Sequence, residues 1–483
     1  MKETARLHIK RKLLFALGLA SWALVPAACV AQTAGEVDKT SNAAMAGEAA
    51  PIIESPYGAY LAGLSAMRAH DLSTAADYMA TALLGAPNDP EVLNQAFLLM
   101  SGEGRFEEAV ALADRVLAVD GDNLAANLLL ATIAAGDGGW EEAAARLDAM
   151  PQRGLGSLLK PLYGAWVEFG RGNSVEAKRL LDEDVTNAGI EFLRYLHEAL
   201  MAELADDDEA ASIAYEAALK SASTPPLRLA WLAGSFYERQ GRHEDAAALY
   251  RRFIEEGRGA TIMAPLLARA EAGGEAASSI DGVQEGIAEV LFNFSSLLNQ
   301  ERASDLALLT IRMALHLRPD FPVAQVLLGE ILQDQDRSAA AIQAYREIPE
   351  KSPFSTIVRL RIAEELERLD AVDEALTELD QLAEDLPGEY EPYYRKGNLL
   401  REHERFEEAV AAYDLAMERL GEPAPRHWSL LYFRGVALER SQQWERAEAD
   451  FLKALELEPE QPFVMNYLAY SWVEQKRNLD EAK

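Results

Sequence analysis

The sequence predicts an all-α fold, a right-handed superhelical solenoid of antiparallel helix pairs with about 12 repeats and one interruption. The first observation behind this prediction is an alanine that recurs at steps close to 34 residues. The second is composition, because hydrophobic residues make up 49% of the chain and aromatic residues 8%, enough for a folded core. The recurring alanine is found at Ala75, Ala109, Ala143, Ala177, Ala211, Ala246, Ala307, Ala341, Ala375, Ala409, Ala447 and Ala482.

One repeat unit, from Trp428 to Gln461, shows the other constant positions. Three small residues in it would let two antiparallel helices approach closely. An aromatic residue would fill the seam with the next unit, and a proline would close the second helix. These residues are Gly435, Ala447, Ala454, Phe451 and Pro459. The pattern resembles the tetratricopeptide repeat, a helix–turn–helix unit of about 34 residues.

The resemblance extends from residue 56 to the end of the chain, and its register breaks once. The step from Ala246 to Ala307 is 61 residues, so an insertion separates two runs of repeats. One interpretation is a surface loop or an irregular helix pair. The other is a joint between two solenoid halves, or a segment that folds into the groove. The predicted boundaries are 56–260 for the first array, 261–287 for the insertion and 288–483 for the second array.

The last repeat of the second array is incomplete. It begins near Pro462 and stops at Lys483, barely into its expected second helix. Solenoids normally finish with a complete capping helix that shields the last apolar face. We therefore expect the natural chain to continue beyond Lys483.

The first 31 residues have the order of an export signal. Basic residues stand at five of the first 12 positions, and an apolar run, Leu13 to Val25, follows. That run is too short to span a bilayer comfortably. Small residues come next, and cleavage after Ala31 would leave Gln32 first. The alternative, a buried N-terminal helix, fits this order of charged, apolar and small residues poorly.

Cys29, the single cysteine, stands where a bacterial lipoprotein signal places its acylated cysteine. Ala27 and Ala28 match that motif and Pro26 does not, so Cys29 is a candidate lipidation site. The other interpretation is a cysteine removed with the signal. Residues 32–55 are rich in Ala, Gly, Ser and Thr and predict a flexible linker. We expect a periplasmic protein without a transmembrane segment after signal removal, associated with the outer membrane if Cys29 is lipidated.

Charge and cysteine content exclude several classes of function. The formal net charge of -33 argues against nucleic-acid binding, which needs a basic face. One cysteine cannot form an internal disulfide or a metal site made of several thiolates. The seven histidines lack the spacing of a helical zinc site, and the chain has neither a phosphate-binding glycine loop nor a nucleophile elbow. We therefore expect no enzyme activity, no cofactor and no metal.

The resemblance implies that the first helix of each unit lines a concave groove. At its inward positions, the last three units combine Tyr with Asn and Arg, residue types suited to binding peptides. The predicted partner-binding residues are Tyr394, Asn398, Arg401, Tyr432, Arg440, Asn466 and Tyr470.

These residues lead to a functional prediction. We expect a non-enzymatic scaffold in the bacterial envelope that binds protein or peptide segments in its concave groove. The alternative is a lipid-anchored accessory subunit of an outer-membrane assembly or a polysaccharide-export complex. The sequence does not identify the partner or the oligomeric state.

Overall fold

The computed structural model describes residues 55–482, apart from 152–153, 183–190 and 258. The predicted export signal with Cys29, and the linker up to residue 54, lie outside the described residues. Within the described ranges the regular secondary structure is entirely helical, so the all-α prediction is confirmed. None of the helices described is both long and apolar enough to cross a membrane.

The chain divides by its contacts into two compact units, unit 1 up to Arg337 and unit 2 from Ser338 onward. Unit 1 contains α2 (Pro56–Arg68), α3 (Leu72–Gly85), α4 (Pro90–Gly102), α5 (Phe106–Val119), α6 (Leu124–Gly136), α7 (Trp140–Ala149), α8 (Leu155–Gly170), α9 (Ser174–Asp182), α10 (Glu191–Leu204), α11 (Asp208–Ser221), α12 (Leu227–Arg239), α13 (His243–Glu255), α14 (Ala260–Glu271), α15 (Val283–Gln300), α16 (Ser304–Leu317) and α17 (Pro322–Asp334). Unit 2 contains α18 (Ser338–Arg346), α19 (Ser355–Arg368), α20 (Val372–Asp385), α21 (Glu391–Glu402), α22 (Phe406–Leu420), the short 3-10 helix η2 (Pro425–His427), α23 (Trp428–Arg440), α24 (Trp444–Leu457) and α25 (Pro462–Glu474).

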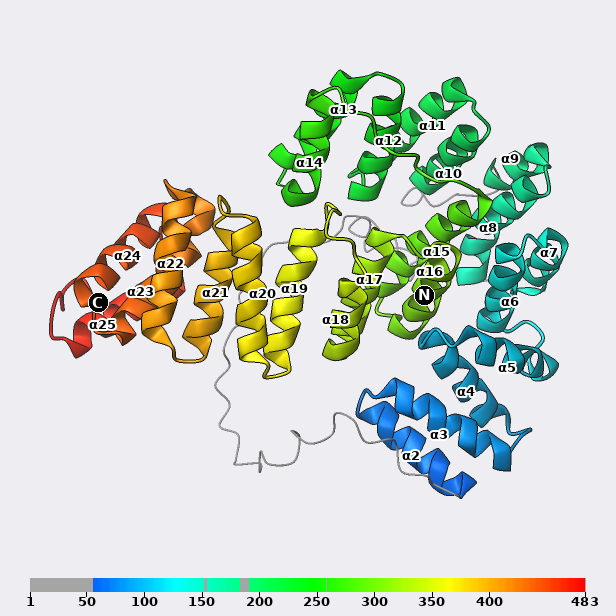
Figure 1. The fold of residues 1–483 in the computed structure, drawn as a ribbon, viewed down its shortest axis with the longest axis horizontal. Coiled ribbons are helices and arrows are strands. Elements are labelled where there is room, and N and C mark those ends of the chain that lie inside the picture. Colours follow the sequence, from blue (N-terminus) through cyan, green and yellow to red (C-terminus); the bar gives the residue numbers. More distant parts are fainter. Residues whose placement is uncertain (1–54, 152–153, 183–190, 258, 483) are drawn as a thin grey trace, which may run out of the picture. The chain divides into compact units, whose positions relative to one another are not determined.

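Consecutive helices pack as pairs, as the repeat predicts (Figure 1). The recurring alanine lies in the first turn of each second helix and is almost completely buried from Ala75 to Ala447. A larger side chain there would push the two helices of the pair apart. The 34-residue period therefore reflects one close helix–helix contact that each unit repeats.

The recurring glycine makes a second close contact within a pair. A Cβ atom added at Gly435 of α23 would lie 2.7 Å from Cε1 of Phe451 on α24. At Gly234 the corresponding distance to Cε1 of Tyr250 is 2.4 Å. The glycine thus leaves room for the aromatic ring that the second helix supplies, and that ring is fully buried.

We expect Gly435→Ala to destabilise unit 2 by about 1–3 kcal/mol, because the added methyl group overpacks the contact with Phe451. The measurement is urea unfolding of the whole chain, followed by circular dichroism. Gly388→Ala is the matched control, since a Cβ atom there meets nothing within 4 Å and Gly388 is exposed. Equal stability of the two variants would contradict this account of the glycine.

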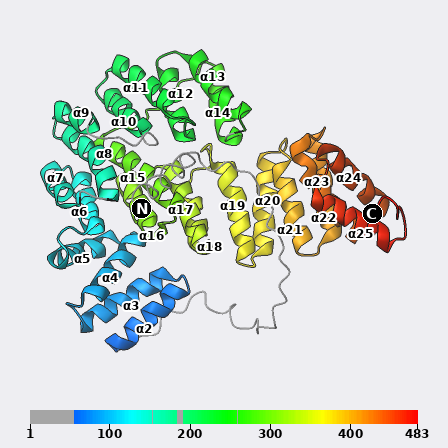
Figure 2. The same cartoon turned by 180° about the vertical axis from the view of Figure 1, so that it is seen from behind.

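Helices α15 and α16 leave the simple stack. They pack against α4, α6, α8 and α10, the first helices of four earlier pairs in unit 1. Figure 1 and Figure 2 both show α15 and α16 inside the arc of those helices. The contact is close, because a Cβ atom at Gly286 of α15 would lie 2.4 Å from the ring of Trp166 on α8. The face that the first helices of these pairs present is therefore covered by a later helix pair of the same chain.

The stretch that breaks the repeat register brings α15 to this face. Residues 260–271 form α14, which packs on α13, and the segment from 272 to 282 then leads to α15. Arg239 of α12 holds this segment by donating from Nη1 to the carbonyl oxygen of Ala277, at 2.7 Å. Ser279 donates to Glu203 of α10, at 3.2 Å. The predicted array boundaries refer to repeat register and stay a prediction, whereas the compact units divide after Arg337.

Candidate partner-binding surface

The first helices of unit 2 lie side by side, since α19 contacts α21 and α21 contacts α23. Five side chains on α21, α23 and α25 combine aromatic rings with amide and guanidinium groups. We call them the aromatic–arginine face. They are Asn398, Arg401, Tyr432, Phe433 and Tyr467.

Arg401 is the charged centre of this face. Its guanidinium lies over the ring of Phe433, 4.6 Å from the ring centroid, so α21 and α23 meet through a cation–π contact. Its Nη2 donates to Glu402 Oε1 at 2.7 Å. Beside it, Asn398 accepts a hydrogen bond of 2.7 Å from the hydroxyl of Tyr413. These contacts fix the orientation of both polar side chains before any partner arrives.

Tyr432 links α23 to α25. Its ring meets the ring of Tyr467 edge to face, with centroids 6.0 Å apart and an interplanar angle of 88°. Tyr467 also donates a hydrogen bond of 3.1 Å to Glu439 Oε2. Burial raises the pKa of Tyr432 above its usual value, while the positive charge of Arg401 opposes that rise. Both phenols are therefore neutral at physiological pH and can donate and accept hydrogen bonds.

The other predicted residues lie in different surroundings. Tyr394 is buried, with its hydroxyl 3.4 Å from Ser429 Oγ and its ring packed against Tyr413. Arg440 is exposed and lies over the ring of Phe406, at 4.5 Å. Tyr394 is therefore a packing residue between neighbouring helices, whereas Arg440 is accessible to solvent or to a partner.

Asn466 and Tyr470 are both exposed on α25, and Tyr470 retains 64% of its accessible surface. The structure places Tyr467, not Tyr470, against Tyr432. The sequence did contain the signal for this, because Tyr467 follows Tyr432 by 35 residues, the same step that separates Ala447 from Ala482. Phe433 was missed as well, because it stands next to the expected inward position.

Internal ion pairs occupy the neighbouring part of the first-helix surface. Glu364 of α19 pairs with Arg361 and with Arg395 of α21, both at 2.8 Å. Arg395 also pairs with Glu391, at 2.8 Å. Within this group of ion pairs the two arginines and the two glutamates balance, and the pair between Arg395 and Glu364 links α21 to α19.

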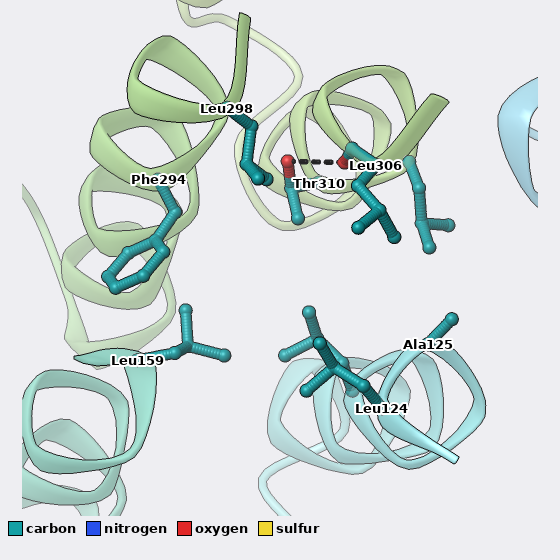
Figure 3. Close-up of a pocket in the computed structure, with 9 residues that line it drawn as sticks. Leu124, Ala125, Leu159, Phe294, Leu298, Leu306 and Thr310 are labelled. Carbon is teal, nitrogen blue, oxygen red and sulfur yellow. Dashed lines mark hydrogen bonds between the residues drawn. The ribbon is translucent and has the colours of Figure 1, made fainter. Parts of the chain in front are cut away.

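Unit 1 has an apolar pocket between α6, α8, α15 and α16 (Figure 3). Its lining residues are Leu124, Ala125, Leu128, Leu159, Phe294, Leu298, Leu306, Leu309 and Thr310. Thr310 carries the one side-chain hydroxyl among them, and it already donates to the carbonyl oxygen of Leu306 at 2.8 Å. This lining offers no free polar group to orient a substrate, so the pocket belongs to the packing of α15 and α16 on the earlier helices.

Across the residues that the structure describes, there is no group of three or more His, Cys, Asp or Glu side chains that could hold a metal ion. The buried carboxylates of unit 1 instead pair with arginines. Glu238 of α12, for example, accepts from Arg269 Nε at 2.6 Å and from the hydroxyl of Tyr250 at 2.8 Å. These groups tie helices together.

Solved structures with a related fold include three proteins of low sequence identity. The yeast Tom70 structure is 15% identical, with 88% of this chain and 90% of that chain covered and a TM-score of 0.34. The structure of the APC/C hetero-tetramer Cut9–Hcn1 is 13% identical, covering 89% and 93%, with a TM-score of 0.33. YrrB, described as a TPR protein with an unusual peptide-binding site, is 19% identical over 37% of this chain and 91% of its own, with a TM-score of 0.29.

No curated protein matches this sequence significantly. Two models of the tetratricopeptide repeat do match it, one at residues 100–163 and the other at 206–261, 294–356 and 394–463. Together these segments make up just over half of the 483 residues. The paired helices and the buried alanine of each unit agree with the models, and the chain belongs to the tetratricopeptide-repeat family.

Proposed function

We propose that this chain is a non-enzymatic scaffold that binds partner proteins through the aromatic–arginine face of unit 2. The observation that carries the proposal is the contrast between the two units. In unit 1, α15 and α16 cover the first helices α4, α6, α8 and α10. In unit 2, Arg401 and Tyr432 keep part of their surface exposed on the first helices.

The chemistry of this face supports binding to a protein segment. Tyr and Arg are among the residue types that most often dominate interface energy, and Tyr buries a large flat surface at modest entropic cost. The contact of Arg401 with Phe433 holds the guanidinium in place, which lowers the cost of ordering it on binding. The partner would be an extended or helical segment, since a row of helices presents a long surface.

Charge bears on which partner fits. The chain as a whole has a net charge of -33, which favours a partner with some basic residues and speeds their encounter. Arg401 and Arg440 would locally accept a carboxylate of the same partner. A segment that carries both signs of charge around an apolar centre fits these features together.

A photo-reactive amino acid tests where partners bind. Placed at Val436 of α23, which is partly exposed beside Tyr432, it should crosslink a partner in living cells. The same group at Lys453, exposed on the second helix α24, is the control. A partner captured equally well at Lys453 would contradict the assignment to the aromatic–arginine face.

Substitution then measures how much the face contributes. We expect Arg401→Ala combined with Tyr432→Ala to weaken binding of the captured partner at least about tenfold, the loss that follows from about 1.4 kcal/mol. The matched control removes Arg419 and Tyr393, a cation–π pair at 5.8 Å between α22 and α21. Affinity is measured by calorimetry, and helical content by circular dichroism. Unchanged affinity in the folded Arg401/Tyr432 variant would remove the face from the proposal.

We also propose that the protein is exported to the bacterial envelope, on the strength of the basic, apolar and small-residue order of the first 31 residues. The N-terminal residue of the purified protein tests this, with Gln32 expected after cleavage behind Ala31. Palmitate labelling that disappears in Cys29→Ala would indicate the lipid-anchored form instead. Recovery of residues 1–31 on a cytoplasmic protein would contradict both forms of export.

A further inference from the structure

Three charged side chains of unit 1 come together where the turn after α4 meets α16. Arg337, which follows α17, has its Nη2 at 2.7 Å from Oε1 of Glu103. Arg312 of α16 donates from Nε to the carbonyl oxygen of Gly102, at 3.3 Å. The side chains of Arg337 and Glu103 are only 7% and 11% exposed. The three groups therefore lie in a largely desolvated cluster.

This cluster carries more positive than negative charge. It has two guanidinium groups and a single carboxylate, Glu103. Nη1 of Arg337 is buried and has no hydrogen-bond partner in the part of the chain that the structure describes. Burial lowers the pKa of Arg312, and the attraction of Glu103, offset by repulsion from Arg337, does not restore it. A buried cation without full compensation is costly, so the cluster is prepared to accept a negative charge.

The turn after α4 places an exposed residue beside the cluster. Gly104 is exposed and has φ of +76°, a conformation that glycine adopts without strain. A Cβ atom at this residue would lie 3.6 Å from Cδ of Arg312, so the missing side chain leaves the stem of that arginine uncovered. One turn further along α16, His316 is exposed and its ring meets Phe106 at 5.1 Å. Neither of these two exposed residues, Gly104 and His316, carries a negative charge that would repel an anion.

We propose that Arg312 and Arg337 form a binding site for one small oxyanion, with Glu103 setting its affinity. The planar fork of a guanidinium matches two oxygens of a phosphate, sulfate or carboxylate group. The Nη1 of Arg337 supplies a donor that no group among the described residues uses. The anion can be free or part of a larger molecule, since the same two forks would hold either.

Thermal unfolding of the full chain in inorganic phosphate tests the proposal, with chloride at equal ionic strength as the reference. We expect a saturable rise in melting temperature in phosphate, because a ligand that binds the folded state stabilises it. The rise should disappear in Arg312→Gln and in Arg337→Gln, and persist in Arg68→Gln, which alters an exposed arginine at the end of α2. Addition of a phosphate monoester separates the sources, since weaker binding than inorganic phosphate indicates a free ion.

Glu103→Gln gives a sharper test that also holds if the arginine variants do not fold. If the cluster binds an anion, Glu103→Gln removes the carboxylate that competes with it. Phosphate affinity should then rise several-fold, because the repulsion between one nearby negative charge and the bound anion is gone. If Glu103 and Arg337 form only a structural ion pair, this variant is less stable and its response to phosphate matches that of chloride. That result, or an equal phosphate response in wild type and Arg312→Gln, would overturn the proposal.

Discussion

Glu289→Ala should destabilise unit 1 by about 3–5 kcal/mol, the largest effect that we expect of a single substitution in this protein. Glu289 lies on α15 and is completely buried. It forms an ion pair with Arg228 of α12 and a second, at 3.4 Å, with Arg318 just after α16. Its removal leaves Arg228 without an acidic partner among the pairs described, in surroundings from which water is largely excluded.

The two arginines are confined by more than their charge. Both guanidinium groups lie over the ring of Phe321, Arg228 at 5.3 Å and Arg318 at 4.8 Å from its centroid. They therefore cannot turn to solvent without losing this packing as well. Arg318 keeps a second partner, Glu285, at 3.3 Å. We thus expect most of the loss to come from the uncompensated charge of Arg228.

Urea unfolding of the whole chain measures this effect, and two further variants define its origin. Glu141→Ala is the control, because Glu141 is 81% exposed and pairs with Arg171 at 2.7 Å, so its loss should cost at most about 1 kcal/mol. Glu289→Gln keeps the side-chain volume and removes the charge. If charge dominates, its loss of unfolding free energy should be close to that of Glu289→Ala. If Glu289→Ala loses no more unfolding free energy than Glu141→Ala, the ion pair between Arg228 and Glu289 does not hold α12 to α15.

The sequence predicts the helix pairs well because the contacts that define them are local. Gly435 and Phe451 are 16 residues apart, and Ala447 lies between them, so one period of about 34 residues contains the whole contact. The packing of α15 and α16 on the earlier helices has no periodic signal of this kind in the sequence. It depends on pairs such as Arg312 with Gly102, which are 210 residues apart. Periodicity says nothing about contacts at that separation.

The candidate surface was predicted in part for a related reason. The inward positions expected of the first helix in each unit include Arg401 and Tyr432, because both follow the register of their own unit. The register does not distinguish an inward side chain that is exposed from one that is packed, and Tyr394 is buried against Tyr413. In the last unit the predicted register begins one residue early, so Asn466 was taken as the equivalent of Tyr432, whereas Tyr467 makes the contact. Whether an inward side chain is buried depends on the helices of adjacent units, and the sequence pattern of a single unit carries no information about them.

His197 should make the stability of unit 1 fall with pH from about 6.5 downward, so that the decline begins above the range in which carboxylates titrate. It is completely buried on α10, and its Nδ1 accepts a hydrogen bond of 3.1 Å from Nε1 of Trp166 on α8. Its other ring nitrogen is buried without a hydrogen-bond partner among the described residues, so a proton added to this ring would leave an unpaired charge in the core. Burial lowers the pKa of His197 to about 3, from a usual value of 6.5.

The direction of the effect follows from which state binds the proton. Between pH 6.5 and about 3, the unfolded chain protonates His197 and the folded chain does not. The stability that neutral His197 contributes is therefore complete above pH 6.5 and is lost as pH falls toward 3. The free energy of unfolding should decrease by up to about 1.4 kcal/mol for each pH unit in this window.

Between pH 6.5 and 5 most carboxylates stay ionised, so the slope in that interval isolates the histidine. In His197→Gln the amide oxygen can still accept a hydrogen bond from Trp166. We expect this variant to lose roughly 2 kcal/mol less free energy of unfolding than wild type between pH 6.5 and 5. Urea unfolding at several pH values measures it. His70→Asn is the control, because His70 is exposed with φ of 59°, a conformation that asparagine tolerates. If His197→Gln and wild type lose stability at the same rate between pH 6.5 and 5, His197 takes up its proton in the folded state, and the dry packing of α10 against α8 is wrong.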